Sequence, residues 1–135
     1  MLKKTIAYTD YDGNERKEDF YFNLTKAELV ELDMGTTGGL EKMIQKIIET
    51  KDQPRIMELF KKIILLAYGE KSADGRRFVK IDKDGHKLAD DFAQTEAYSE
   101  LFMELATNDN AASAFVNGII PANLNAPAIA PVANV

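Results

Sequence analysis

Cysteine and tryptophan are absent from this chain of 135 residues, and histidine occurs once. Without cysteine there can be no disulfide, no thiolate metal site and no cysteine nucleophile, a composition that fits a reducing compartment. The chain also has no apolar run long enough to span a membrane, and the N-terminal "MLKKTIAYTD" lacks the apolar region of a signal peptide. We therefore expect a cytoplasmic protein without membrane contact.

Positive charge is also scarce, with 17 Lys and Arg against 22 Asp and Glu, for a net charge of −5. Binding to nucleic acid requires clustered Lys and Arg that neutralise phosphates. Arg76, Arg77 and Lys80 form a basic group too small for that role, so nucleic acid is not an expected partner. No charged residue occurs from Asn110 to Val135.

Residues 3–23 are predicted to form a β-hairpin. The residues of "DGN", at 12–14, favour a turn between two segments in which apolar and polar residues alternate. One face of the hairpin would carry the apolar residues Ile6, Tyr8, Phe20 and Phe22. A lone hairpin is only marginally stable in water, so we expect this face to pack on another part of the chain.

Two helices are predicted next. Thr25 and Glu28 have the spacing of a capping box, and Leu24 and Leu29 occupy the hydrophobic-staple positions. A short helix should begin there and end near Gly35. After "TTGG", a second helix is predicted from an apolar stripe formed by Leu40, Met43, Ile44, Ile47 and Ile48.

A third helix is predicted to begin at Asp52, with Pro54 in its first turn, and to end at a C-cap formed by Tyr68 and Gly69. Its stripe comprises Ile56, Leu59, Phe60, Ile63 and Ile64. The end of this helix, "IILLAY", is apolar all round, and Met57 lies off the stripe. Such a surface is either enclosed by its own domain, the simpler interpretation, or covered by a partner.

The remaining segments are short. Residues 70–87 are rich in turn residues and would form a small hairpin or loop around the strand "FVKI". A helical turn is expected at 88–92, a long helix over 95–106, and a short helix that follows Asn108 or Asp109 and ends at Gly118. In residues 122–135, Ala, Asn and Pro without periodicity favour a flexible tail.

These segments predict an α+β fold that is mainly α: an N-terminal β-hairpin followed by about five helices, with a short turn or hairpin insertion and a flexible C-terminal tail. We expect one globular domain over residues 1–121, with the hairpin at 3–23 and the helical part at 25–118. Residues 122–135 would form the tail.

No metal site is predicted. "DYDG" and "DKDG" resemble part of a calcium-binding loop, but the alignment places Tyr8 and Lys80 where its first carboxylate ligand should be. Both fragments are therefore interpreted as turns.

No catalytic or cofactor-binding site is predicted either. His86 lies in a polar stretch without a recognisable nucleophile, and Asp90 and Asp91 fit an exposed face. "TTGGLEK", at 36–42, lacks the phosphate-loop and dinucleotide-binding patterns and is interpreted as a connector. We do not expect an enzyme.

Four ordered motifs carry a resemblance to a known family: "YTDYDGNERKEDFYFNLTKAEL", "GGLEKMIQKII", "FKKIILLAYGEKSADGRRF" and "QTEAYSELFMELATNDNAASAFVNGIIP". Together they resemble the tail assembly chaperones of tailed phages and prophages of Gram-positive bacteria, over nearly all of residues 3–121. The segment 80–92 differs from the family pattern in length or composition, and the tail from Ala122 extends beyond the usual "NGIIP" ending.

The resemblance implies a non-enzymatic role in the host cytoplasm. Such chaperones bind the long, helical tape measure protein, keep it soluble and extended, and leave as tail-tube subunits polymerise, so they are absent from the mature virion. In many such phages a frameshifted longer product recruits the tail tube protein. The rival interpretations are a minor structural tail or connector protein that stays in the virion, and a small enzyme or regulator.

A chaperone for a helical client needs apolar surface that it can present reversibly. The candidate partner-binding residues are Leu65, Leu66, Phe102, Met103, Phe115, Ile119 and Ile120. Ordinary core packing is the alternative for each of them. The apolar end of the third helix would suit a second copy of the chain as well as a client, so homo-oligomerisation stays open.

Overall fold

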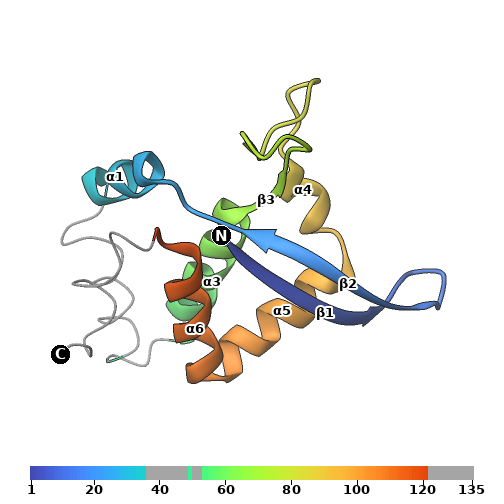
Figure 1. Ribbon diagram of the computed structural model, residues 1–135. Helices are drawn as coiled ribbons and strands as arrows, with labels where there is room; N and C mark the ends of the chain where they lie inside the picture. The colour runs from blue at the N-terminus through green and yellow to red at the C-terminus, as the bar shows by residue number, and fades with distance from the viewer. Residues whose placement is uncertain (36–48, 50–52, 122–135) are drawn as a thin grey trace.

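The computed structural model describes residues 1–35, 49 and 53–121 (Figure 1). In chain order the elements are β1 (Leu2–Thr9), β2 (Glu15–Phe22), α1 (Lys26–Gly35), α3 (Gln53–Ala67), β3 (Tyr68–Lys71), β4 (Phe78–Val79), α4 (Leu88–Phe92), α5 (Glu96–Thr107) and α6 (Asp109–Ile119). The second predicted helix and the predicted C-terminal tail lie outside the described residues.

The N-terminal hairpin forms as predicted. β1 and β2 pair antiparallel, with Leu2 opposite Phe22 and Lys4 opposite Phe20. Since directly paired residues share a face, this register places Ile6 and Tyr8 on the same face as Phe20 and Phe22. α5 and α6 pack against β1. The apolar face therefore finds the cover that a hairpin needs.

The predicted fold, with an N-terminal hairpin and a separate short insertion, was wrong about the sheet. The hairpin strands β1 and β2 are only half of a single sheet. Four strands form one antiparallel sheet in the order β1-β2-β3-β4, and β3 pairs with β2 through Phe22 opposite Tyr68. The fold is thus α+β with a four-stranded sheet. The supposed insertion supplies β4, which pairs with β3.

The predicted helix C-cap at Tyr68 and Gly69 was wrong for the same reason. α3 ends at Ala67 and the chain passes directly into β3. A Cβ at Gly69 would lie 2.6 Å from the Phe78 ring and 2.8 Å from the Val79 carbonyl oxygen. Gly69 therefore permits the close approach of β4, a requirement set by a distant strand.

Three helix starts have the local hydrogen bonds that the sequence favours. At α1, Thr25 Oγ1 accepts the Glu28 N–H at 3.1 Å, and Glu28 Oε1 accepts the Thr25 N–H at 2.8 Å. This confirms the capping box. Thr95 caps α5 and Asn108 caps α6 through their side-chain oxygens.

Phe92, at the end of α4, is the centre of the aromatic core. Its ring is 2% exposed and stacks on Tyr68, with centroids 4.3 Å apart. Phe20, Phe22 and Tyr98 lie within 5.9 Å of it, by ring centroids. Strands β2 and β3, helix α4 and helix α5 are thereby joined through one side chain.

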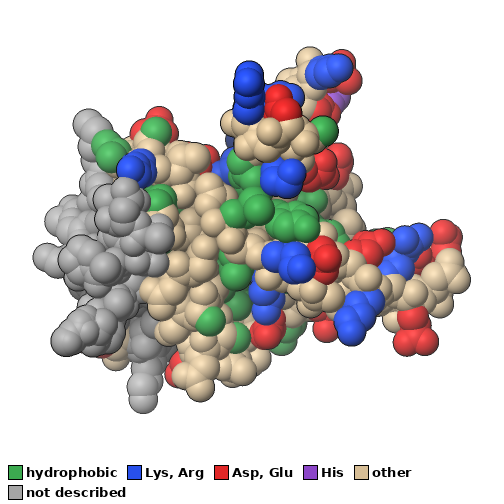
Figure 2. Space-filling view, viewed as in Figure 1, with side chains coloured by type: hydrophobic (Ala, Val, Ile, Leu, Met, Phe, Trp, Pro, Cys, Tyr) green, Lys and Arg blue, Asp and Glu red, His purple; other side chains and the backbone are tan. Residues whose placement is uncertain are grey.

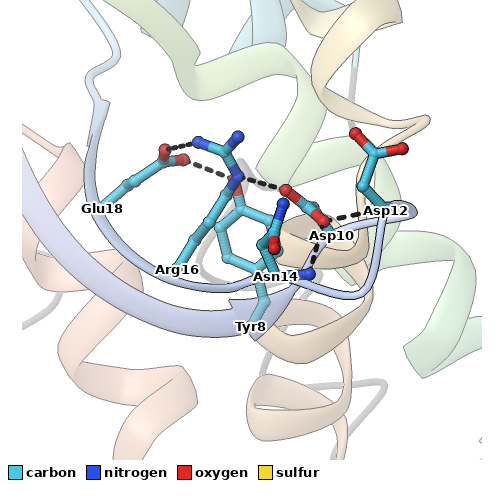
Figure 3. Close-up of polar contacts among 6 residues, drawn as sticks. All are labelled: Tyr8, Asp10, Asp12, Asn14, Arg16 and Glu18. Atoms are coloured by element: carbon cyan, nitrogen blue, oxygen red, sulfur yellow. Dashed lines mark hydrogen bonds and ion pairs between the residues drawn. The ribbon is translucent and has the colours of Figure 1, made fainter.

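Charged side chains are concentrated on two projections in Figure 2, the β1–β2 hairpin end and the loops around β4, while hydrophobic side chains gather between them. Figure 3 shows the hairpin end, with contacts among Tyr8, Asp10, Asp12, Asn14, Arg16 and Glu18. Arg16 donates to Asp10 at 2.6 Å and lowers the pKa of that carboxyl. Gly13, at φ 85°, supplies the left-handed residue of the turn.

Candidate partner-binding site

Helix α3 has one buried apolar face and one accessible face, on which apolar and charged residues are mixed. Leu59, Phe60, Ile63 and Ile64 are at most 5% exposed, which confirms most of the predicted stripe. On the other side Met57 is 45% exposed, and Leu65 and Leu66 are half-buried. The apolar end of this helix is therefore only partly enclosed by the described part of the domain.

The first half of the accessible face lines an open groove of about 410 Å³ between α3 and α5, which we call the α5 groove. It is lined by Met57, Glu58, Lys61, Ala93, Tyr98, Ser99, Phe102 and Met103. Met103 is 55% exposed, whereas Tyr98 and Phe102 are half-buried and connect through neighbouring rings to Phe92. The floor of this groove is thus anchored in the aromatic core.

The second half of the face lines a groove of about 440 Å³ between α3 and the segment leading into α4, which we call the α4 groove. Its lining residues are Glu28, Lys62, Leu65, Leu66, Tyr68, Lys80, Ile81, Lys87, Ala89 and Asp90. Lys61 and Lys62, which line the α5 and the α4 groove, are consecutive on α3, and Ala93 and Asp90, which line the same two grooves, lie directly after α4 and within it. The two grooves therefore follow one another along α3.

Lys80, which the sequence places in a small basic group with Arg76 and Arg77, lines the α4 groove. Its Nζ donates to both carboxylate oxygens of Glu28, at 2.9 and 2.7 Å, and to the carbonyls of Asn23 and Leu66, at 2.8 and 2.9 Å. The ammonium group neutralises Glu28 and satisfies a carbonyl at the C-terminus of α3. Its role is structural.

The predicted contact residues fall into two groups. Leu65 and Leu66 line the α4 groove, and Phe102 and Met103 line the α5 groove. The other three are at most 7% exposed and belong to the core: Phe115, Ile119 and Ile120. Their burial corresponds to the core packing that the sequence analysis held as the alternative.

Met57, Tyr98 and Ile81 are among the groove residues that were not candidates from sequence. Met57 lies off the predicted apolar stripe of its helix, and that position was the one indication in the sequence that its side chain would be accessible. Tyr98 has helical spacing to Leu101, Phe102 and Leu105, as core residues of a helix do, so nothing in the sequence marked it as accessible. Ile81 is 58% exposed and forms an isolated β-bridge with Lys87, a pairing that no local sequence pattern predicts.

Among the described residues, one group of possible metal ligands lies close together: the side chains of Asp82, Asp84 and His86 offer atoms within 4.8 Å of one another. Asp82 Oδ1 already accepts the backbone N–H groups of Asp84 and His86, at 2.9 and 2.8 Å. Asp10 Oδ1 makes the same two bonds in the hairpin turn. The proximity thus follows from a turn geometry that the chain uses twice.

His86 contributes to neither groove. Its side chain is 76% exposed, and Nδ1 lies 3.6 Å from Asp82 Oδ2. Asp90 and Asp91 are exposed on α4, as expected. None of the described helices combines the length and the apolar character that crossing a bilayer requires.

Two adjoining apolar grooves on a small α+β domain define a protein with a surface suited to binding another. The chain belongs to a family of phage proteins: a family model described as phage tail assembly chaperone matches residues 1–131. The match confirms the resemblance and extends it into the segment after Pro121. Comparison with curated proteins found no match, and comparison with solved structures found none either.

Membership of this family indicates a role in assembling the phage tail, with a tail protein as partner. The description of the family as a chaperone points to a non-enzymatic role. The grooves, with apolar floors and charged rims, are consistent with protein binding.

Proposed function

We propose that this chain binds the tape measure protein of its phage and keeps it soluble and extended until the tail tube forms around it. The family supplies the assembly role. The observation that carries the binding proposal is the grouping of accessible apolar residues in two successive grooves along α3.

The mode of binding is a client helix lying along α3. From Met57 to Leu66, α3 rises about 14 Å at 1.5 Å per residue, or two and a half turns. A client helix of about three turns would place apolar residues at i, i+3 or i+4, and i+7 against this face. Leu65, Leu66, Phe102 and Met103 are the contacts from the sequence analysis that suit this mode, joined by Met57 and Ile81. Met is well suited to an adaptable contact.

The wider assembly role has three parts. The chaperone acts in the bacterial cytoplasm, leaves as tube subunits polymerise, and is absent from the mature virion. The tail tube protein is a second partner only through a longer frameshifted product of the kind that the family resemblance implies for many such phages. In this proposal residues 1–121 form the domain that binds the client.

Co-expression with the tape measure protein tests the binding surface. The double variant Met57→Glu/Met103→Glu places two charges in the α5 groove, where burying an unpaired charge against the client is costly. We expect the wild-type chain to keep the tape measure protein in the soluble fraction and to co-purify with it, and the double variant to lose at least about 90% of that capture.

Tyr11→Glu/Val30→Glu is the matched control. Tyr11 and Val30 are 77% and 55% exposed, and neither lines a groove. This variant carries the same added charge and should capture the client like the wild type. Equal capture by both double variants would contradict the proposed surface, and failure of the wild type to capture the client would contradict the proposed function.

A further inference from the structure

The charges around the α4 groove differ in sign from the charge of the whole molecule. The residues that line the α4 groove include three Lys and two acidic residues, Glu28 and Asp90, whereas the chain carries a net charge of −5. A surface with a small positive excess on an acidic protein favours an acidic partner over a basic one.

Two of these cations are available to a partner. Lys62 lies on α3 and Lys87 directly precedes α4, so they line the α4 groove from different walls. Both are exposed, and within the described part of the chain neither side chain has a hydrogen bond or ion pair. Lys80 differs, because Glu28 and two backbone carbonyls already occupy its ammonium group.

Leu65 and Leu66, which are half-buried, line the same groove as these two cations. A helix that covered them would bring the residues beside its own apolar stripe near Lys62 and Lys87. Acidic residues there would gain two ion pairs in a partly desolvated rim, and basic residues would meet like charges. Asp90, on the α4 wall, offsets one of the two cations and keeps the expected effect moderate.

We propose that the α4 groove selects client helices that carry Asp or Glu beside their apolar stripe, with Lys62 and Lys87 as the residues that determine this preference. The inference rests on the proposed function, because it assigns the client chemistry at the same surface. It makes the α4 groove the selective half of the site, and leaves the α5 groove as its apolar half.

Two synthetic helical peptides of about 20 residues test this preference, a length that spans the whole α3 face. They share one stripe of Leu and Ile and differ only in having Glu or Lys beside it. Fluorescence anisotropy measures the Kd of the full chain for each. We expect the Glu peptide to bind about five- to tenfold more tightly at low salt, which two partly exposed ion pairs can supply. The difference should shrink below about threefold near 0.5 M salt.

The variant Lys62→Glu/Lys87→Glu should reverse the preference, and Lys17→Glu/Lys83→Glu is its control. Lys17 and Lys83 are exposed, line neither groove and give the same change in net charge. Equal binding of the two peptides by the wild type, or a preference unchanged in the groove variant, overturns the inference.

Absence of binding to both peptides overturns docking along α3 itself, and with it this inference. That result is distinct from failure of the proposed function, which the solubility of the co-expressed tape measure protein reports separately. Circular dichroism and thermal unfolding of each variant show whether a change in binding reflects a change in folding.

Discussion

Lys80 joins three parts of the molecule through one ammonium group. Its four hydrogen-bond contacts reach α1 through Glu28, the end of β2 through Asn23 and the end of α3 through Leu66. The ion pair between Lys80 and Glu28 is only partly exposed, at 21% for the Lys80 side chain and 25% for that of Glu28. Loss of the ammonium group would leave a carboxylate and two carbonyls without that partner, although Glu28 would still accept the Thr25 N–H.

We therefore expect Lys80→Met to lower the free energy of unfolding by about 2 kcal/mol, as charge-assisted hydrogen bonds of this kind contribute. Urea unfolding followed by circular dichroism measures it. Lys83→Met, at an exposed turn position, should change the value by less than about 0.5 kcal/mol. If the two variants were equally stable, Lys80 would be an ordinary surface cation.

Gly69 and Gly118 differ in the atoms that an added Cβ would meet. A Cβ at Gly69 would meet a ring and a backbone carbonyl at 2.6 and 2.8 Å, whereas a Cβ at Gly118 would meet the flexible end of Leu2 at 2.8 Å. We expect Gly69→Ala to destabilise the protein by about 1–3 kcal/mol through overpacking. Gly118→Ala should be nearly neutral, because Ala is favoured over Gly within a helix.

Chemical denaturation of the two variants tests this contrast. If Gly69→Ala were as stable as Gly118→Ala, β4 would not require the close approach that we describe. The measurement therefore bears on why β3 begins directly after α3.

At the scale of elements, β3 is held against α4 by Tyr68, whose ring stacks on Phe92. Burial raises the pKa of Tyr68 to about 12, with a further contribution from Glu70. In the unfolded chain the pKa of the Tyr68 phenol is near 10. The phenol therefore loses its proton at a lower pH in the unfolded chain than in the folded protein. The stabilising contribution is thus fully present below about pH 10 and is lost as the pH rises towards about 12.

Tyr68→Phe cannot ionise, so its free energy of unfolding should fall less steeply between pH 9 and about 11 than that of the wild type. Urea unfolding at a series of pH values measures the slope. Tyr11→Phe, at a side chain that is 77% exposed, should retain the wild-type slope. A wild-type slope in Tyr68→Phe would mean that Tyr68 is not buried against α4 as described.

Elements with local signals were predictable from the sequence. Thr25, Thr95 and Asn108 precede α1, α5 and α6, and each acts through a hydrogen bond within a few residues of its own position. The strand β3 was missed because Tyr68 and Gly69 follow a helix exactly where a C-cap is common. Only the pairing of Tyr68 with Phe22, far away in sequence, decides between cap and strand.

At the scale of the whole molecule, periodicity identified apolar helix faces but not which of them the other elements cover. Phe115 and Phe102 look alike in sequence. Phe115 packs on Phe22, with ring centroids 5.2 Å apart, and is 2% exposed, whereas Phe102 is half-buried and lines the α5 groove. The site depends on where α3, α4 and α5 meet, which is a property of the assembled fold.

The proposed departure of the chaperone predicts the composition of the phage particle. Mass spectrometry of purified virions should find tape measure and tail tube peptides but no more than trace peptides of this chain. Abundant peptides would instead favour a minor structural tail protein. Lysates of induced cells serve as the positive control, because the chain should be readily detected there.

The central claim is that a tail protein covers the face of α3 where the two grooves lie, and methionine oxidation measures this directly. Met57 and Met103 are 45% and 55% exposed in the α5 groove, and Met1, 58% exposed and outside both grooves, is an internal control. In the complex with the tape measure protein, peroxide oxidation of Met57 and Met103 should slow at least about fivefold while Met1 reacts as before. Unchanged oxidation of Met57 and Met103 in a stable complex would contradict the account.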